Sequence, residues 1–580
     1  MTTDLEGIRP RVNSWRTRAA RPEAQRLAAE LKVSVTVGDV LWQLGQRDAE
    51  TCRRFMEPRL ADLSSPEKMV DRAVLARRLA TAIRKQERIV VYGDYDCDGI
   101  TAAAILSEAC ERMGGKVIVE LASRFDGGYG LTAAALERVR QHMPQVLVTC
   151  DCGSSDHQSL RELGQFGVDC LVIDHHLVPD EPLPALAFLN PHRPECGFPF
   201  KGLASCGLAL SVVAALRTEL GVEFDLRSCL DLVAIGTIAD VAPLVGDNRM
   251  LVRAGLRLLD KPRRPGLRAL MRRARFEPGS TMTAEDVAFR IAPRLNAPGR
   301  IGSPMPALRL LLVQTEAEAE VIADEIEALQ TERRAQQDAM LEDAEAEIRA
   351  RGWQHSQALV VGKPSYNVGI VGIVAGKLAE RYDCPVVMYG AEGFVARGSA
   401  RAPAGTPLFD LVKATASCLV RYGGHHAAAG LEVELERVDE FRDRFVQAAG
   451  DRLSQRGDQS EPRAEREVLL LDPKDEPMCV AKELLLLEPC GEGNRLPLIG
   501  IAGRVASARE LRGGHLRLEL QRENGEIIGG FGPRQGHRAD AMPSPALAVG
   551  TLRVTTFAGR QRAELLVTDV VAWESGTAAP

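Results

Sequence analysis

Short apolar runs recur between residues 88 and 177, and a polar turn and a helical stretch follow each of them. The runs lie in the segments RIVVYGDYD, KVIVELAS, QVLVTCDCG and DCLVIDHHL. Continuous apolar runs of this length are typical of strands buried on both faces, and the helical stretches between them indicate crossover connections. The pattern therefore predicts a parallel sheet covered by helices.

The segments on either side of this pattern have a different character. Residues 1–80 contain helical segments of mixed charge, and we expect an N-terminal helical cap there, followed by the first α/β domain over residues 81–315. Residues 316–352 are rich in Ala, Glu, Gln and Arg and contain neither Pro nor Gly before Gly352. These residue types favour one long helix. We expect this helix to connect two domains.

The C-terminal part of the chain predicts two further units. Residues 353–455 repeat the strand and helix alternation, with ALVVG, a helical segment and PVVMYG, and a polar linker follows them. Residues 465–575 contain LRLEL, EIIGGFG, LAVGTLRVTTFAG and AELLVTDVVAW, which are short strands with Gly turns and no helices between them. That pattern indicates a small β-barrel. The fold class is therefore α/β: a parallel-sheet domain and a second α/β domain joined by a long helix, with a C-terminal β-barrel.

Composition and charge restrict the function classes. The chain has 580 residues, 45% hydrophobic and 26% charged, which is typical of globular proteins and too long for a single core. The net charge of −6 excludes a uniformly basic nucleic-acid binder, so any site for a polyanion must be local. Residues 253–275 carry nine basic residues against one acid, which is either such a site or a helical face balanced by acidic neighbours.

Features that the sequence lacks bear on where in the cell the protein is located. No apolar stretch approaches the roughly 18 residues of a membrane span, and the N-terminal segment MTTDLEGIRPRV has no apolar region of a secretory signal. The 13 cysteines are odd in number and include no CxxC pair, which favours reduced thiols over disulfides or a zinc site. We therefore expect a cytoplasmic protein with no membrane partner, in which Cys150 and Cys152 are packing residues.

Acidic and histidine residues follow successive predicted strands, where parallel sheets collect ligand groups. They are Asp94, Asp96 and Asp98, Asp151, Asp174, His175 and His176, and Asp240. One DxD is commonly a turn and one His pair commonly lies on a surface, but this many acids in one cleft would repel each other unless cations neutralised them. Oxygen ligands with imidazole and no thiolate suit Mn²⁺ or Mg²⁺. A two-metal site of this kind hydrolyses phosphodiesters.

These segments resemble a known family. VYGDYDCDG, TCDCG, IDHH and IGTIADVAPL resemble the four motifs of the DHH phosphoesterase superfamily. RFDGGYGL, RLNAPGR, GSAR, GGHHAAAG and EPCGEGNRLP are similar to segments of RecJ-type single-strand-specific exonucleases. The resemblance implies a DHH domain, a connecting helix, a DHH-associated domain and an oligonucleotide-binding fold. It also implies a 5′→3′ exonuclease of DNA repair and recombination that acts on single-stranded DNA, with a single-strand-binding protein and a helicase as protein partners.

The resemblance also assigns roles at the metal site. It implies that two Mn²⁺ or Mg²⁺ ions are held by Asp96, Asp98, Asp151, His175 and Asp240, with Asp151 as the bridge. Asp94 either binds a metal ion directly or supports the residues that do. Asp174 orients a histidine, since ligating imidazoles usually donate their other N–H to a carboxylate. His176 then contacts the scissile phosphate.

A second set of residues is implied for the substrate. Arg124, Ser399 and Arg401 correspond to a pocket for the 5′ end, and guanidinium groups do bind phosphate bidentately. Asn296 and Arg300 lie in a rigid loop that suits contacts with the phosphate backbone, and His425 can reach the substrate through the tight turn that Gly423 and Gly424 allow. A surface ion pair, an exposed turn, a structural loop or a helix cap would explain the same residues without DNA. Asn367 stands where the family commonly has a histidine.

Two other functions fit parts of the sequence. DHH phosphodiesterases that act on short oligonucleotides or cyclic dinucleotides are similar in the two catalytic domains but lack the barrel, so residues 465–575 argue against that function. A catalytically inactive DNA-binding scaffold would require broken metal motifs. Here every acidic and histidine position of the four motifs is filled.

Overall fold

A computed structural model describes residues 15–424, 428–456, 466–557 and 560–573, apart from residues 278 and 280. The first α/β domain contains five parallel strands in the order β3-β2-β4-β5-β6. The strands are β2 (Arg88–Gly93), β3 (Lys116–Leu121), β4 (Val146–Cys150), β5 (Asp169–Ile173) and β6 (Ala187–Leu189). The parallel sheet predicted from the sequence is confirmed.

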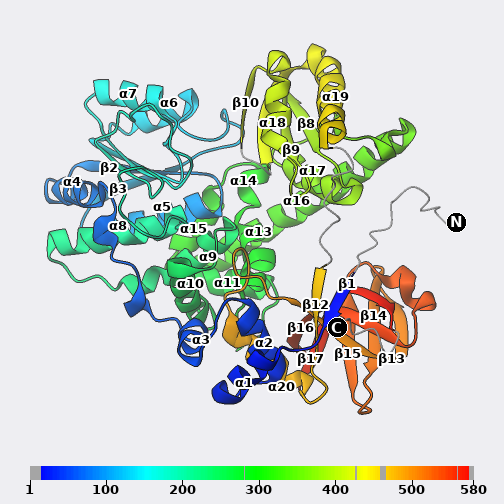
Figure 1. The fold of residues 1–580 in the computed structure, drawn as a ribbon. Helices are drawn as coiled ribbons and strands as arrows, with labels where there is room; N and C mark the ends of the chain where they lie inside the picture. The colour runs from blue at the N-terminus through cyan, green and yellow to red at the C-terminus, as the bar shows by residue number, and fades with distance from the viewer. Residues whose placement is uncertain are drawn as a thin grey trace.

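Side chains alternate between the two faces of this sheet. Ile89 and Val91 join the core under α5 and α8, whereas Val90 and Tyr92 join the core under α6 and α7. Figure 1 shows α6 and α7 on one face of the sheet and α5 and α8 on the other face. The helices of this part are α4 (Arg72–Arg84), α5 (Cys97–Arg112), α6 (Ala133–Gln141), α7 (His157–Gln165), α8 (Ser205–Leu220), α9 (Leu230–Ala239), α10 (Gly246–Leu259), α11 (Pro265–Arg273), α12 (Ala284–Asp286), α13 (Ala292–Leu295), α14 (Pro298–Ile301) and α15 (Met305–Leu312).

The long helix is confirmed as α16 (Glu316–Ala350), which begins at the cap residue Thr315. Its first turns neutralise the basic stretch noted in the sequence. Arg268 and Arg272 pair with Glu316, Arg273 pairs with Asp324, and Arg264 pairs with Glu108 and Asp231. Acids from distant segments therefore pair with four of the nine basic residues, which agrees in part with a helical face balanced by acidic neighbours.

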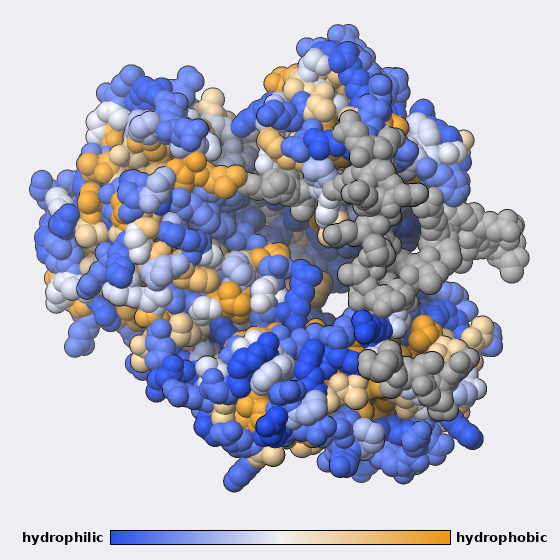
Figure 2. Space-filling model, in the orientation of Figure 1, coloured by the Kyte–Doolittle hydropathy of each residue, from blue (hydrophilic) through white to orange (hydrophobic). Residues whose placement is uncertain are grey.

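The second α/β domain contains a mixed sheet in the order β10-β11-β9-β8-β7. Its elements are β7 (Leu359–Gly362), α17 (Val371–Tyr382), β8 (Val386–Glu392), β9 (Val395–Arg401), α18 (Leu408–Ala414), β10 (Arg421–Gly424), β11 (Ala428–Glu434) and α19 (Val438–Arg456). Figure 1 places α16 between this sheet and the first domain, and Figure 2 shows the surface notched between the two lobes.

The C-terminal strands form a closed barrel, because β13 pairs with both β14 and β16 while β15, β17 and β16 complete the ring. The elements are β12 (Arg466–Leu470), α20 (Pro477–Leu484), β13 (Leu498–Leu511), β14 (His515–Gln521), β15 (Ile527–Gly532), β16 (Ala546–Phe557) and β17 (Arg560–Ala572). The predicted β-barrel is therefore present.

The N-terminal helices pack against this barrel and share its core. They are α1 (Pro22–Leu31), α2 (Val35–Gln43) and α3 (Ala49–Met56). A short strand, β1 (Trp15–Arg18), precedes them and pairs in parallel with β12. We expected only helices here, because a partner strand some 450 residues away leaves no local signal. No helix within the described ranges is long and apolar enough to cross a membrane.

Candidate metal centre and phosphate pocket

The first strand ends in a loop that carries three acids. Asp96 caps α5, and its Oδ1 accepts the N–H groups of Asp98 at 3.0 Å and Gly99 at 3.2 Å. The helix starts directly against the loop because Gly99 has no side chain: a Cβ there would lie 2.5 Å from the backbone N of Asp94. Asp94 and Asp98 are both almost fully buried.

Asp98 is held from the other side of the domain. Its two carboxylate oxygens accept the backbone N–H groups of Ser205 at 2.7 Å and Cys206 at 2.9 Å, at the first turn of α8. The positive end of a helix dipole stabilises a carboxylate in this position. This contact could not be predicted from local sequence, since the partners are more than 100 residues apart.

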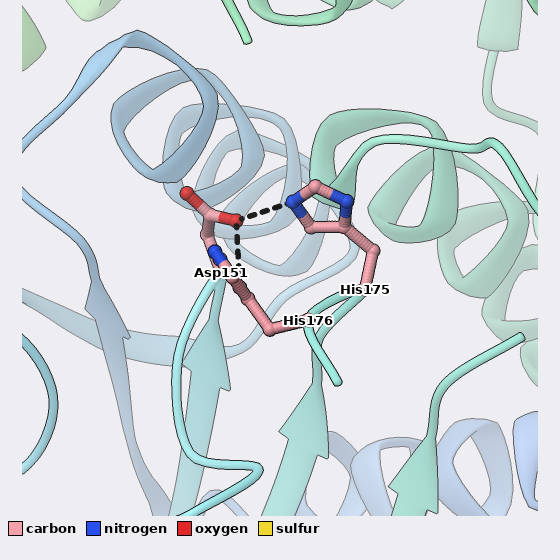
Figure 3. Close-up of side chains that lie close together, drawn as sticks. All are labelled: Asp151, His175 and His176. Atoms are coloured by element: carbon pink, nitrogen blue, oxygen red, sulfur yellow. Dashed lines mark ion pairs between the residues drawn. The ribbon is translucent and has the colours of Figure 1, made fainter. Parts of the chain in front are cut away.

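Asp151 lies at the centre of the cluster, directly after β4. Its backbone has φ of +66°, a left-handed conformation that Asp adopts more readily than most residues. Ser205 Oγ donates to Asp151 Oδ1 at 3.0 Å, and the same oxygen lies 3.2 Å from Nε2 of His175. Figure 3 shows both histidine rings directed towards this carboxylate.

The two histidines have different surroundings. His175 Nε2 lies 3.7 Å from Asp240 Oδ2 and has no hydrogen-bond partner among the described atoms, although it is buried. Burial lowers the pKa of His175, which favours a neutral ring with a free lone pair. His176 Nδ1 instead lies 2.8 Å from Asp174 Oδ1 and 3.1 Å from the hydroxyl of Tyr129. No pattern in the sequence singled out Tyr129 or Ser205 as a functional residue.

Too little positive charge surrounds the carboxylates of the cluster for all of them to ionise together. Burial, followed by the charges of Asp98 and Asp96, raises the pKa of Asp151 well above its usual value and that of Asp240 to about 8. Burial and Asp96 likewise raise the pKa of Asp94, whose Oδ1 is buried without a partner in the described ranges. Such acids ionise together only when cations neutralise them.

A metal therefore fits the residues that are present. Three groups each bring their ligand atoms within 4.8 Å of one another: Asp151 with His175 and His176, Asp98 with His175 and Asp240, and Asp94 with Asp96 and Asp151. Hard oxygen donors with imidazole suit Mn²⁺ or Mg²⁺. All four motifs of the sequence meet in this one cluster.

A second cluster lies where the two α/β domains meet. Arg124 stacks on Tyr95, with its guanidinium carbon 3.8 Å from the ring centroid, and its Nε is buried without a hydrogen-bond partner in the described chain. Arg401 Nη1 donates to Ser399 Oγ at 2.8 Å on β9. A Cβ on Gly372, in the first turn of α17, would meet both Ser399 and Arg401. These side chains therefore lie over the positive end of α17.

Arg300 joins this cluster from the end of α14. Its Nη1 donates to the carbonyl of Gly369, just before α17, at 3.1 Å. Burial, and then the positive charge of Arg124, lower the pKa of Arg300 to about 9. None of Arg124, Arg300 and Arg401 forms an ion pair with a described acid. Unpaired guanidinium groups at a helix N-terminus form a site for an anion.

The remaining predicted site residues are less well defined. Asn296 ends α13, and its half-buried side chain makes no hydrogen bond to a described residue. His425 lies outside the described residues. Asn367, at the position of the family histidine, donates to Gln336 of α16 at 3.0 Å and accepts the N–H of Gly369 at 2.8 Å. It therefore ties the entry to α17 onto the connecting helix.

Comparison with known proteins agrees with this arrangement. Residues 88–237 match the DHH family N-terminal domain, residues 355–451 the DHHA1 domain and residues 469–569 the RecJ OB domain. The chain is 31% identical to the single-stranded-DNA-specific exonuclease RecJ of Bacillus subtilis, over 96% of this chain and 70% of the relative. It is 36% identical to RecJ of Thermus thermophilus, over 89% of this chain and 73% of the relative.

The chain belongs to the RecJ family of single-stranded-DNA-specific exonucleases. The structure of T. thermophilus RecJ in complex with Mn²⁺ matches with a TM-score of 0.79 at 32% identity, covering 97% of this chain and 80% of that one. The structure of the same RecJ with Mg²⁺ matches with a TM-score of 0.73 at 29% identity, covering 97% of this chain and 79% of that one. The expected RecJ resemblance is therefore confirmed over nearly the whole chain.

Proposed function

We propose that this RecJ family member hydrolyses single-stranded DNA from the 5′ end, in the 5′→3′ direction, with two Mn²⁺ or Mg²⁺ ions, in DNA repair and recombination. One observation carries the proposal: the acid and histidine cluster adjoins a cluster of guanidinium groups that form no ion pair with a described acid. Tyr95 joins the two, since it lies between Asp94 and Asp96 in the chain and under Arg124 in space. A phosphodiester can therefore lie in the cluster while a phosphate occupies the pocket.

At the metal centre, we assign the ligand roles to the residues implied by the motifs. They are Asp96, Asp98, Asp151, His175 and Asp240, with Asp151 between the two positions and Asp94 in support. Two ions bound there stabilise the attacking and leaving oxygens of an in-line displacement at phosphorus. Ser205 and the first turn of α8 fix Asp151 and Asp98 before substrate arrives. This preorganisation reduces the reorganisation that the transition state requires.

His176 acts on the phosphate and Asp174 acts on His176. Burial lowers the pKa of His176, but the hydrogen bond and charge of Asp174 outweigh burial and raise this pKa to about 9. Asp174 therefore favours the protonated form of the ring. Both of its short polar contacts involve Nδ1, so Nε2 is available to donate to a phosphate oxygen. A positive donor there stabilises the charge that develops on the departing oxygen.

The 5′→3′ direction of digestion depends on the proposed pocket for the 5′ end. Arg124, Ser399 and Arg401 form it across the boundary of the two domains, and Asn296, Arg300 and His425 are assigned to the rest of the strand. A terminal phosphate carries more charge than an internal one, so paired guanidinium contacts favour it. The barrel adds a surface for nucleotides farther along the strand, as oligonucleotide-binding folds do.

A single-strand-specific enzyme needs a supply of unpaired DNA. We infer that a helicase and a single-strand-binding protein present the substrate, and that the protein works in the cytoplasm. All thirteen cysteines are free, and Cys150 and Cys152 are fully buried beside Asp151, which supports a reducing compartment.

The function is tested by the choice of substrate. Purified full-length chain is incubated with a single strand, the same strand in a blunt duplex, a linear dinucleotide and a cyclic dinucleotide, each with Mn²⁺ and with chelator. We expect mononucleotides from the single strand, little cleavage of the duplex, and none with chelator. Faster turnover of the dinucleotides than of the long strand would instead assign a DHH phosphodiesterase. Binding without cleavage in Mn²⁺ would assign an inactive scaffold.

A further inference from the structure

The connecting helix α16 has a buried polar face that the family assignment leaves unexplained. Gln330, Arg333 and Gln337 lie along it, and they are only 1%, 8% and 6% exposed. Arg333 Nε donates to Gln330 Oε1 at 3.0 Å, and its Nη1 donates to Gln337 Oε1 at 2.9 Å. Neither bond uses Nη2, and Nε2 of Gln330 is buried without a partner in the described chain. Two glutamines thus hold a guanidinium that forms no ion pair with a described acid.

Neighbouring contacts of α16 locate this guanidinium. Glu327, which precedes Arg333 by six residues, pairs with Arg294 of α13 at 2.7 Å. Gln336, three residues after Arg333, accepts from Asn367 at the entry to α17. Arg333 therefore lies between α13 and the first turn of α17, which is the stretch of α16 beside Arg300.

Positive charges outweigh negative ones around Arg300. Arg300 is half-buried and Arg333 is buried, and neither forms an ion pair with an acid of the described residues. Burial, Arg124 and Arg333, in that order, lower the pKa of Arg300. Neighbouring cations that are shielded from water and have no ion-pair partner are unfavourable unless an anion joins them. The first turn of α17 adds the positive end of a helix dipole on the same side.

We propose that Arg333 binds a phosphate of the single-stranded substrate from the connecting helix, next to the pocket of Arg124, Ser399 and Arg401. This inference rests on the proposed function, and it adds a contact from α16 to those from the two domains that α16 joins. Gln330 and Gln337 keep the guanidinium plane fixed, so the contact is formed without reordering a long side chain.

The test measures binding of a fluorescent single strand to the full-length chain in chelator, over a range of salt concentrations. Arg333→Gln is expected to raise Kd about tenfold at low salt, the lower end for a charged hydrogen bond. It should also reduce the slope of log Kd against log salt by about 0.7, the value for one phosphate contact to a single strand. Arg333→Lys should keep the slope, because an ammonium still binds phosphate as a point charge.

Arg334→Gln is the matched control, because Arg334 is the next residue on the same helix and is exposed, and its loss changes the net charge equally. It should leave Kd and slope close to wild type. Arg333→Met, which keeps the apolar stem, serves as a second charge-free variant if Arg333→Gln does not fold. Strands with a 5′ phosphate and with a 5′ hydroxyl show which phosphate Arg333 binds. A loss of affinity confined to the 5′-phosphorylated strand indicates the terminal phosphate, and an equal loss for both strands indicates an internal phosphate; either result supports the contact.

An unchanged slope in a folded charge-free variant would overturn the inference. So would equal losses in Arg333→Lys and Arg333→Gln with lowered melting temperatures, which would show that Arg333 only packs the helix. Wild-type chain that binds no single strand at all would overturn the proposed function together with this inference. Wild-type chain that binds and digests strands while the Arg333 variants match it would overturn the inference alone.

Discussion

His176 Nδ1 lies 2.8 Å from Oδ1 of Asp174, and this buried carboxylate is fixed by its neighbours. It accepts the backbone N–H of His175 at 2.8 Å, and its other oxygen accepts that of Ser154 at 3.0 Å. Burial raises the pKa of Asp174, but the hydrogen bond and charge of His176 outweigh it and lower this pKa to about 2. The two side chains therefore form an ion pair across the neutral range.

Asp174→Asn should lower kcat about 10- to 100-fold, the usual effect of removing a carboxylate that orients an active-site histidine. The pKa of His176 should fall from about 9 towards or below its usual value near 6.5. The alkaline limb of the kcat profile in Mn²⁺ should therefore move to lower pH. Asp247→Asn, which removes a buried acid that holds Ser64, is the control for damage to folding. Matching pH profiles for wild type and Asp174→Asn would contradict the assignment.

Asp151→Asn should abolish cleavage, to below a tenth of wild-type turnover in Mn²⁺. Asn is a better replacement than Ala, because it tolerates the left-handed backbone of Asp151. In chelator the variant should be as stable as wild type or more so, since it no longer has to bury an ionisable carboxyl in a crowded acidic cluster. Thermal unfolding in chelator and turnover in Mn²⁺ test the two halves separately. A variant that retained substantial turnover would exclude Asp151 as the bridging ligand.

Metal-free protein should lose stability as pH rises. The folded-state pKa of Asp240 is about 8, above its unfolded value near 3.8, so its protonated form stabilises the fold below pH 4 and that stability declines up to pH 8. Asp94 and Asp151 shift in the same direction. His176 acts likewise: its stabilisation is complete below pH 6.5 and is lost as pH rises through about 9. Melting temperatures at pH 5, 7 and 9 in chelator should fall steadily. Mn²⁺ should restore stability most at the highest pH, and a flat chelator series would contradict the crowded cluster.

Arg401→Ala should reduce the preference for a 5′-phosphorylated strand over a 5′-hydroxyl strand by about 1.5–3 kcal/mol, the range for a hydrogen bond to a charged group. The comparison is of kcat/KM for both strands with both proteins. Arg397→Ala is the matched control on the same strand of the sheet, because Arg397 already pairs with Glu392 and Glu432. It should leave the preference unchanged. A preference equally reduced in both variants would remove Arg401 from the pocket.

The parallel sheet and the metal cluster could be predicted from the sequence because their signals are local. Each strand of the first domain reads as an apolar run, and each acid follows its strand within a few residues, so topology alone brings Asp94, Asp151 and Asp174 to one edge. The long helix could also be predicted, since residues 316–350 contain neither Pro nor Gly.

The features that the sequence did not reveal depend on distant partners. Ser205 reaches Asp151 across 54 positions, and β1 pairs with β12 from the far end of the chain. Part of the basic excess at 253–275 is balanced by acids of another helix, among them Glu316 and Glu320. Arg333 is the opposite case. The sequence places it among the charges of a helix that is expected to be solvent-exposed, and only the fold shows that it is buried and forms no ion pair with a described acid.

The most direct test of the account follows release of label from a long single strand carrying the label at the 5′ end or the 3′ end. With Mn²⁺ and wild-type chain, the 5′ label should appear first, as a mononucleotide, while the 3′ label stays on long fragments until late. With chelator neither label should be released. Early release of the 3′ label, or release of either label in chelator, would contradict the metal-dependent 5′→3′ mechanism and the pocket that directs it.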